Sequence, residues 1–371
     1  MTQRRSAAPT ITDVARHADV SMKTVSRVLN AEPNVVPALR ERVMASVAAL
    51  NYRPNVNARS LAGARSYLLG LLYYASSAAF IVGLQRGATT RCRQRGYHLV
   101  VEPLEDGAPD LAQQLTQMIA ALRPDGMILA PPVSDNAEVI RILAAAGMPC
   151  VLISPGDHSP ARGRVSMDDQ LAAREMTDYL LALGHRRIGF IRGPDAQAAA
   201  PRRLAGYAQA LAAHGLALDP ALLAQGDFTF RTGQEACDAL LNLAVPPTAI
   251  FAANDDMALG AAVAAQRRGL QVPAGLSIAG FDDSPLASLA WPQLTTVRQP
   301  VVEMAEAAVD LLVSRPTDGG LADEPGLAPM RSPSSGGAPS ASAAHPPANT
   351  APVLGHTLVI RESTAAPNAP G

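Results

Sequence analysis

The sequence predicts an N-terminal all-α helix-turn-helix headpiece followed by an α/β core of two lobes, each a doubly wound parallel sheet. Two features lead to this prediction. The first 66 residues are basic and have the pattern of three short helices, whereas the rest alternates short apolar strands with amphipathic helices. A chain of 371 residues with 48% hydrophobic side chains is long enough for a headpiece and two further lobes.

Residues 10–30 have the pattern of two short helices joined by a tight turn. Thr10 followed three residues later by Asp13 is a capping box, and Ser21 is a suitable cap for the second helix. Apolar residues recur at helical spacing at Ile11, Val14, Ala15, Ala18, Val25, Val28 and Leu29. The opposite face of the second helix carries Met22, Lys23, Ser26 and Arg27. This shape can place side chains in a DNA major groove, and the alternative is a helical hairpin whose polar face is only solvated.

A third helix is expected to begin at Pro37, with Leu39, Val43, Val47 and Leu50 closing a three-helix core. The segments SMKTVSRVLN and NYRPNVNARSLAG, together with this helix, closely resemble the headpiece and hinge of the LacI/GalR family of transcription regulators. The resemblance covers nearly all of the first 63 residues. It implies a headpiece over residues 9–54 and a hinge helix with its linker over residues 55–66.

The resemblance also implies how the headpiece would contact double-stranded DNA. Met22 and Lys23 would contact base edges, and Arg27 a base or a phosphate. Hydroxyl and amide side chains suited to phosphate contacts are Thr10, Ser21, Thr24, Ser26 and Asn30. The hinge helix would begin at Asn55 and enter the minor groove, with Leu61 wedged between base pairs and Ala58 and Arg59 beside it. Two such headpieces are needed for a pseudo-palindromic operator, so a homodimer is implied.

Charge is distributed unevenly along the chain. Residues 1–66 contain ten Arg and Lys against four Asp and Glu, whereas the remainder contains 21 against 28. Lys23 is the only lysine, and the other 30 basic residues are arginines. A basic headpiece on an acidic body predicts a polyanionic partner at one end only.

Several classes of protein find no support in the sequence. Cys92, Cys150 and Cys237 are too widely spaced for a disulfide or metal pattern, which favours a reducing, cytoplasmic location. Neither a signal peptide nor a membrane-spanning run is expected, so no membrane partner is predicted. The sequence contains no phosphate-binding glycine motif, no nucleophile elbow and no clustered metal ligands. We therefore expect no enzyme activity, no cofactor and no metal.

After residue 66, apolar runs such as GMILAPP, RIGFIRGP and TAIFAAND alternate with amphipathic helices, which predicts parallel sheets covered on both faces. This layout resembles the periplasmic-binding-protein-like core of the same family over residues 67–313 plus 355–365. The resemblance implies a first lobe over roughly residues 67–163 plus a return segment after residue 295, and a second lobe over roughly 164–292 plus the last strand. It also implies a hinge where the chain crosses and an effector in the cleft. The intervening residues 315–354, rich in Pro, Gly, Ser and Ala, are expected to be a disordered insertion.

Polar groups at the ends of predicted strands are candidates for binding the effector. Matched to the family pattern, they are Arg203, Asn254 and Asp282 for hydroxyl groups, Phe228 for stacking, and Ser154 where some members carry an aspartate. Phe80, with Ser76 and Ser77, follows the first strand and is a further candidate. Other interpretations remain open: Asp255 and Asp283 as helix caps, and Phe228 as a core residue. His185 is expected to be structural, and Trp291 to pack near the lobe junction.

These observations predict a sequence-specific transcriptional regulator, a repressor in the first instance, controlled by a small molecule that is expected to be a sugar. The alternatives are a sugar-binding transport protein without a transcriptional role, an α/β enzyme acting on a sugar or nucleotide, and a regulator responding to a purine or another metabolite. Neither the operator nor the effector can be named from the sequence.

Overall fold

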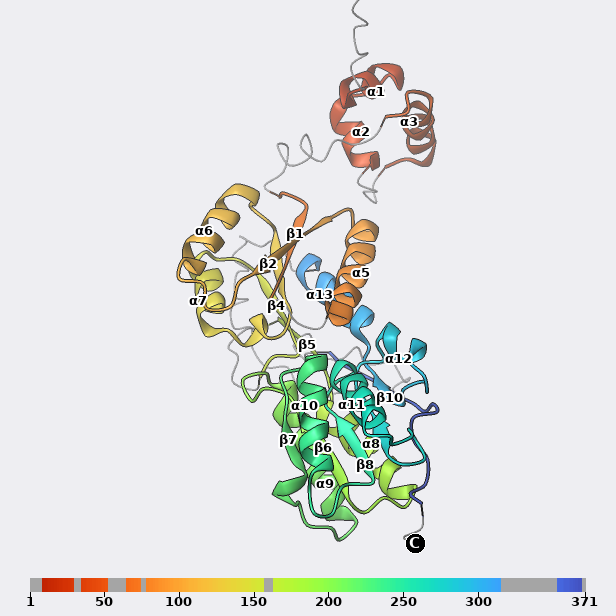
Figure 1. Ribbon diagram of the computed structural model, residues 1–371. Helices are drawn as coiled ribbons and strands as arrows, with labels where there is room; N and C mark the ends of the chain where they lie inside the picture. Colours follow the sequence, from red (N-terminus) through yellow and green to blue (C-terminus); the bar gives the residue numbers. More distant parts are fainter. Residues whose placement is uncertain are drawn as a thin grey trace, which may run out of the picture. The chain divides into compact units, whose positions relative to one another are not determined.

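The computed structural model describes residues 9–29, 35–52, 65–74, 78–156, 163–314 and 352–368. The chain forms two compact units, Met1–Tyr67 and Leu68–Gly371, which are drawn in Figure 1. The first unit is the predicted headpiece, and the second is the predicted two-lobed core.

Three helices form the headpiece: α1 (Ile11–His17), α2 (Met22–Leu29) and α3 (Pro37–Ala49). The predicted capping box is present, since Thr10 Oγ1 accepts from Asp13 N at 3.4 Å and Asp13 Oδ2 accepts from Thr10 N at 2.9 Å. Ser21 Oγ accepts a hydrogen bond from Thr24 N at 3.1 Å at the start of α2, as predicted. Asp19 has a φ of 48° in the intervening turn, which is a conformation that aspartate tolerates better than most residues.

The headpiece core differs from the prediction at one position. Val43 is fully buried, and Val47 and Leu50 pack against the cluster, but Leu39 lies outside it. Tyr52 occupies the core instead. Asn51 turns the chain back with a φ of 48°, and Tyr52 N donates to Val47 O at 2.9 Å. This helix-ending motif characteristically places the residue after the left-handed one against the last turn of the helix.

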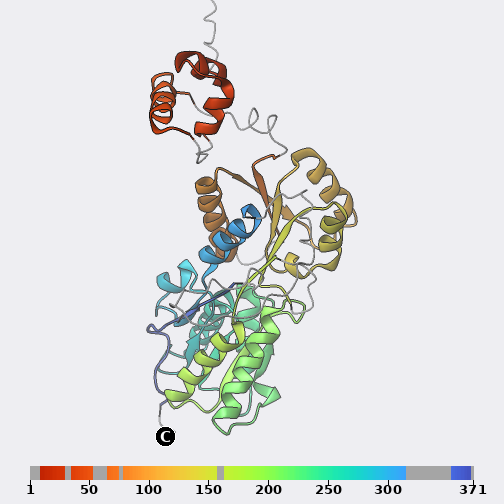
Figure 2. The same ribbon diagram turned by 180° about the vertical axis from the view of Figure 1, so that it is seen from behind.

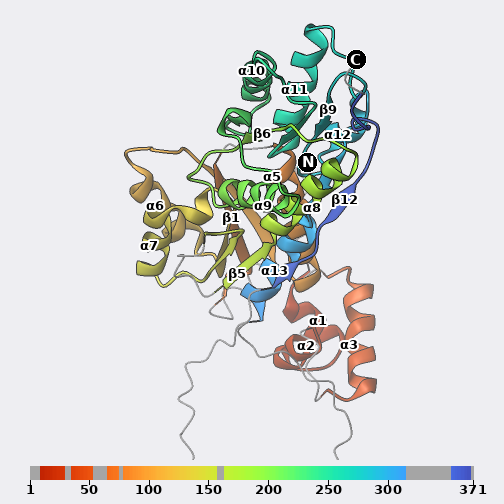
Figure 3. The same cartoon turned by 90° about the horizontal axis from the view of Figure 1, so that it is seen from below.

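The first lobe is built on a six-stranded parallel sheet in the order β11-β5-β4-β3-β1-β2. Its strands are β1 (Leu68–Tyr74), β2 (His98–Leu104), β3 (Gly126–Leu129), β4 (Cys150–Ile153), β5 (Gly163–Met167) and β11 (Val353–Leu354). Its helices are α5 (Ala78–Arg95), α6 (Leu111–Leu122), η1 (Val133–Asp135), α7 (Ala137–Ala145) and α13 (Val301–Val313). Figures 1 and 3 show α6 and α7 on one face of the sheet and α5 with α13 on the other.

Two boundaries of this lobe differ from the sequence prediction. β5 pairs with β4, so the first lobe continues to Met167 rather than ending near residue 163. β11 pairs with β5, although its two residues were assigned to the end of the insertion. Pro and Gly dominate that segment, and a two-residue strand at its end has no alternating pattern that could reveal it.

The second lobe is built on a four-stranded parallel sheet in the order β7-β6-β8-β9. Its strands are β6 (Ile188–Arg192), β7 (Leu223–Gln225), β8 (Ala249–Ala252) and β9 (Ser277–Ala279). Its helices are α8 (Asp169–Ala182), α9 (Ala199–Ala213), η2 (Pro220–Leu222), α10 (Phe230–Leu241), α11 (Asp255–Arg267) and α12 (Pro285–Leu289). The two views in Figures 1 and 2 show α8 with α9, and α10 with α11, on opposite faces of the sheet.

The chain crosses between the lobes in three described places: after β5, between β10 (Thr296–Arg298) and α13, and between β11 and β12 (Thr357–Val359). β10 and β12 pair with each other in an antiparallel ribbon. These crossings form the hinge that the sequence predicts. Because β11 belongs to the first lobe, the last crossing comes after β11, directly before β12.

His185 has a structural role, as predicted, because it joins the C-terminal segment at Ala365 to the second lobe. The ring is buried, with Nδ1 2.8 Å from Thr248 Oγ1 and Nε2 2.9 Å from Ala365 O. Burial lowers the pKa of His185 despite the hydrogen bond to the Ala365 carbonyl. A neutral ring can accept from the threonine and donate to the carbonyl at the same time.

The prediction that Trp291 packs near the lobe junction is wrong, because its side chain is 82% exposed. The backbone folds back after α12, and Leu294 N donates to Ala287 O at 2.8 Å. Ala287 and Leu294 occupy the buried positions of this turn, which leaves Trp291 on the outside.

Candidate functional site

The predicted polar face of α2 is accessible. Met22 is 53% exposed and Lys23 is exposed, while Val25 and Val28 are buried on the opposite side. Thr24, Ser26 and Arg27 are half-buried. The first turn of α2 contains no acidic residue that would repel a phosphate. The DNA contacts proposed for Met22, Lys23, Thr24, Ser26 and Arg27 remain predictions.

The hydroxyl groups proposed to contact phosphates also shape the helix ends. Thr10 Oγ1 donates to Asp13 Oδ2 at 2.7 Å, and Ser21 Oγ lies 2.9 Å from Thr24 Oγ1. Seven further candidates lie outside the described residues: Asn30, Asn55, Ala58, Arg59 and Leu61 of the predicted DNA interface, and Ser76 and Ser77 of the predicted cleft.

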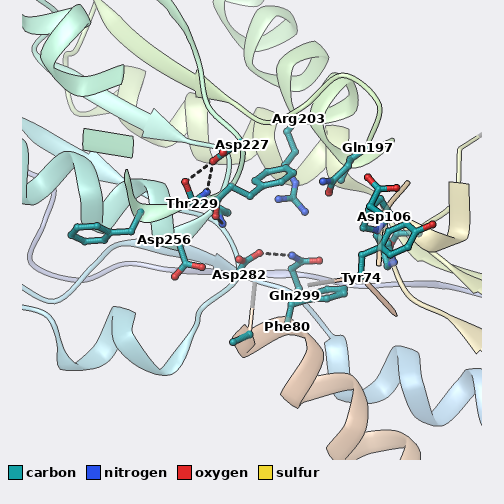
Figure 4. Close-up of a pocket in the computed structure, with 18 residues that line it drawn as sticks. Tyr74, Phe80, Asp106, Gln197, Arg203, Asp227, Thr229, Asp256, Asp282 and Gln299 are labelled. Atoms are coloured by element: carbon teal, nitrogen blue, oxygen red, sulfur yellow. Dashed lines mark hydrogen bonds between the residues drawn. The ribbon is translucent and has the colours of Figure 1, made fainter. Parts of the chain in front are cut away.

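A cavity of about 540 Å³ lies in the second unit, at the carboxyl ends of strands from both lobes. All six predicted effector residues line it, namely Phe80, Ser154, Arg203, Phe228, Asn254 and Asp282. Figure 4 shows Arg203 and Asp282 pointing toward each other across it, with Phe80 on the first-lobe side. Strand order reverses beside β1 and β6, which is where open α/β sheets bind ligands.

Arg203 is fixed by several contacts on one wall of the cavity. Its Nε and Nη2 lie 2.9 and 2.8 Å from Asp169 Oδ1, and its Nη1 donates to Ala253 O at 2.6 Å. The guanidinium carbon lies 3.7 Å from the centre of the Phe281 ring, in the range of a cation–π contact. The second oxygen of Asp169, Oδ2, is buried without a hydrogen-bond partner. The guanidinium is therefore held rigidly, with its charge balanced by a buried carboxylate.

Asn254 holds the loop that carries Phe228. Its Oδ1 accepts from Met257 N at 3.0 Å and so caps α11, while its Nδ2 donates to Phe228 O at 3.0 Å. Phe228 has a φ of 68°, and its ring lies so close to Gly193 that a β-carbon there would overlap it. The cap of α11 is thus Asn254 and not Asp255, the residue that the sequence offered as an alternative cap.

Asp282 lies opposite Arg203 and accepts a hydrogen bond from Gln299 Nε2 at 2.6 Å. Burial raises the pKa of Asp282 to about 7, against the lowering effects of Arg203 and Gln299. Burial, followed by the charge of Asp282, raises the pKa of Asp255 well above its usual range. Near neutral pH, Asp282 can therefore both accept and donate hydrogen bonds.

Asp255 and Asp283 hold the loop around Asp282 in place. Asp255 is fully buried and accepts from Thr296 Oγ1 at 2.6 Å and from Ser284 N at 2.7 Å. Asp283 forms ion pairs with Arg298 and Arg361, each at 2.6 Å, rather than capping α12. The two carboxylates join this loop to β10 and to the C-terminal segment.

The first-lobe wall contains residues that the sequence analysis missed. Tyr74 ends β1, and its hydroxyl accepts from Asn136 Nδ2 at 2.7 Å. Asp106 follows β2. Ser154, which the sequence did predict, follows β4 on the same wall with a φ of 45°. Tyr74 belongs to an uninterrupted apolar run, which gave no sign of a polar role. Asp106 follows a strand end, so that position could have indicated it.

Other missed residues come from the second lobe and the crossover. Gln197, Thr229, Phe230 and Asp256 lie at the starts of helices, and Gln299 precedes α13. Gln299 could not have been predicted from strand ends alone, since it reaches the cavity only because the chain crosses there.

Two family models match the chain. Residues 10–55 match the model of bacterial regulatory proteins of the lacI family, and residues 177–333 match that of the periplasmic binding protein-like domain. The chain is 35% identical over 306 residues to catabolite control protein A of Priestia megaterium, which covers 82% of this chain and 91% of the relative. The chain belongs to the lacI family of bacterial regulatory proteins.

Solved structures of lacI-family members extend the likeness across both units. A lac repressor dimer bound to operator and the anti-inducer ONPF has a TM-score of 0.72 and 30% identity, covering 96% of this chain and 99% of that one. The complex of transcriptional regulator CelR with cellobiose has a TM-score of 0.67 and 31% identity, with the same coverage.

Family membership confirms the predicted fold class, a helix-turn-helix headpiece with a periplasmic-binding-protein-like core, and makes the chain a DNA-binding transcriptional regulator. The alternative of a transport protein without a transcriptional role does not account for the match over residues 10–55. Across the described part of the chain, no helix combines the length and the apolar character needed to cross a membrane.

Proposed function

We propose that this lacI-family member is a cytoplasmic repressor whose affinity for a pseudo-palindromic operator is set by a sugar bound between the lobes. It acts as a homodimer, because two headpieces are needed to contact two half-sites. The observation that carries the proposal is the cavity itself: an arginine, an amide, carboxylates and aromatic rings converge on it in a chain with a basic headpiece.

The cavity chemistry suits a polyhydroxylated ligand. Asp282 and Gln299 offer acceptors and a donor within 2.6 Å of each other, and Arg203 faces them with a fixed guanidinium. Neighbouring hydroxyl groups of a sugar can each give and take one hydrogen bond with such a set. The ring of Phe228 provides an apolar surface for the C–H face of a sugar.

The three crossings provide a route from the cavity to the DNA. A ligand that contacts Arg203 on one lobe and Tyr74 on the other stabilises one lobe angle over others. Coupling between two sites in such switches is typically about 1–3 kcal/mol. A shift of that size changes operator affinity about 5- to 150-fold.

A selection of duplexes from a random pool, made with purified full-length protein, tests the proposal. We expect enrichment of a sequence with two related half-sites, and binding that weakens steeply as salt is raised. A gel shift repeated with a panel of sugars should find one that changes operator affinity. Titration of that sugar shows whether it strengthens or weakens operator binding. Failure to enrich any duplex, with and without the sugars, would overturn the proposal.

A purine or nucleoside effector is the remaining alternative for the cavity. The same gel shift with adenine, hypoxanthine, adenosine and cytidine separates the two classes. A response to one of these, with none to any sugar, would replace the sugar in the proposal while leaving the DNA-binding function intact.

A further inference from the structure

The charged side chains that line the cavity are unevenly balanced. In the described part of the chain they are Asp106, Asp227, Asp256 and Asp282 against Arg203. The cationic group does not offset these four carboxylates, because its charge is already balanced by Asp169 at 2.8 Å. Even with Asp282 partly protonated near neutral pH, the side chains that line the cavity therefore carry more negative than positive charge.

Helix N-termini, which usually attract phosphate, are already matched with carboxylates on the second-lobe side. At α10, Asp227 Oδ1 accepts from Thr229 N at 2.9 Å. Asp227 is an exposed residue, and although partial desolvation raises its pKa, hydrogen bonds from Thr229 and Thr232 lower that pKa overall. At α9, Asp135 Oδ2 accepts from Ala198 N at 3.4 Å. Both carboxylates bind the backbone N–H of the residue that precedes the first turn, so a ligand anion approaching either helix end would meet a like charge.

The third helix that begins at the cavity, α11, carries two carboxylates in its first turn, Asp255 and Asp256. Asp255 is fully buried, and Asp256 lines the cavity. Asp256 is placed where the partial positive charge of the helix end would otherwise attract a ligand anion, whereas the raised pKa of Asp255 favours its neutral form. A carboxylate therefore lies near the start of each of these helices: Asp135 of the first lobe at α9, Asp227 of the preceding loop at α10, and Asp256 of the first turn at α11.

The behaviour of the protein's own carboxylate agrees with this electrostatic picture. Burial raises the pKa of Asp282, and the nearby charges of Asp256 and Asp169 raise it further, although Arg203 faces it. Negative charge is disfavoured at this position even for a group built into the fold. Burial is the main cause, so a dianionic phosphate placed beside Asp282 would lose more hydration than a single carboxylate does, and Asp256 would also repel it.

Aromatic rings complete the wall. Phe228, Phe230, Phe80 and Tyr74 line the cavity together with the carboxylates. Ring faces attract cations as well as C–H groups, so rings and carboxylates act in the same direction on a ligand carrying an ammonium group.

From these observations we infer that the cavity selects by charge: it accepts neutral or ammonium-bearing polyols and excludes phosphorylated ones. The inference deepens the proposed function and rests on it, since it names the chemical class of the effector for the same cavity. It separates this chain from any regulator that senses a phosphorylated sugar.

The test is calorimetric titration of the full-length protein with matched sugars at constant ionic strength. The sets are glucose, glucosamine and glucose 6-phosphate; galactose, galactosamine and galactose 6-phosphate; and ribose with ribose 5-phosphate. For each set in which a member binds, we expect the phosphorylated sugar to bind at least about tenfold more weakly than the neutral one. Equal or tighter binding of a phosphorylated sugar would overturn the inference and would point to the start of α5, whose first turn carries no acidic residue.

Isosteric Asp→Asn variants test whether the cavity carboxylates cause the selectivity against phosphorylated sugars. Asp106→Asn and Asp256→Asn each remove one negative charge, and each should narrow the ratio between neutral and phosphorylated sugar roughly three- to tenfold. Asp110→Asn is the matched control, because Asp110 is exposed, lies outside the cavity, and its hydrogen bond from Gln114 can be kept. An unchanged ratio in both cavity variants would show that charge does not set the selectivity.

Inorganic phosphate separates failure of this inference from failure of the proposed function. If no sugar in the panel binds, the sugar effector is wrong, yet phosphate still reports on the cavity. In that case, we compare how far phosphate raises the melting temperature of the unmodified protein and of Asp106→Asn. We expect the increase in the unmodified protein to be equal to or smaller than the increase in Asp106→Asn. A larger stabilisation of the unmodified protein would contradict the inference.

Discussion

Arg203→Ala should destabilise the second lobe as well as remove a contact to the effector. The substitution deletes the partners of Asp169 Oδ1 and Ala253 O, at 2.6–2.9 Å, and the cation over the Phe281 ring. Asp169 is 1% exposed, and its Oδ2 has no hydrogen-bond partner even in the unmodified protein. In the variant, its Oδ1 would also lose Arg203, which would leave a buried carboxylate without its ion-pair partner. Removing one member of a buried pair typically costs about 3–5 kcal/mol.

The expected loss is large enough to measure by thermal unfolding. For a lobe of this size, about 3–5 kcal/mol corresponds to a fall in melting temperature of about 6–20 °C. The same samples should fail to respond to any sugar that stabilises the unmodified protein. Operator binding by the folded variant should persist, because α1, α2 and α3 belong to the other compact unit.

A double variant separates the structural role from the binding role. Asp169→Leu combined with Arg203→Met replaces the ion pair with apolar side chains of similar volume, which is often close to neutral in stability. We expect most of the lost melting temperature to return without any sugar response. A melting temperature unchanged within about 2 °C in Arg203→Ala would refute the reasoning about the buried pair. Recovery of the sugar response in the double variant would refute the proposed contact.

Three further substitutions probe the headpiece, the cavity loop and the C-terminal anchor. Lys23→Ala should weaken binding to the operator by about 1–3 kcal/mol in a gel shift, and binding to random DNA far less. Equal losses of affinity for both DNAs would contradict a base contact. Arg16→Ala, which removes an exposed positive charge from α1, is the charge-matched control. Gly193→Ala should push the Phe228 ring aside and weaken sugar binding about 3- to 10-fold by calorimetry with operator affinity in the absence of sugar unchanged. Because the folded pKa of His185 lies below its unfolded value, the unfolded chain takes up the proton first, so the melting temperature should fall as pH drops below about 6.5. The fall should be shallower in His185→Gln, and an identical pH profile would exclude His185 as its source.

The sequence alone was sufficient for the headpiece helices and the order of strands and helices in the core. These features depend on local patterns: the capping box at Thr10, the helical spacing of Val25 and Val28, and apolar runs that are buried on both faces of a parallel sheet. It also identified residues that converge on the cavity. Ser154, Phe228, Asn254 and Asp282 follow strand ends, which meet at a common edge of such sheets, whereas Arg203 was assigned through the family resemblance and lies inside α9.

Only the tertiary structure decided how the side chains at those strand ends are used. Asn254 was predicted to contact the effector, and the structure shows that its amide also caps α11 and holds the Phe228 carbonyl. Arg203 depends on Asp169, a residue 34 positions away whose importance no local pattern reveals. Gln299 reaches the cavity through a crossing of the chain, and Trp291 is exposed because Ala287 and Leu294 occupy the buried positions of its turn. Local patterns record which face of an element is apolar, whereas these contacts depend on which distant segments meet and on how the buried charges among them are paired.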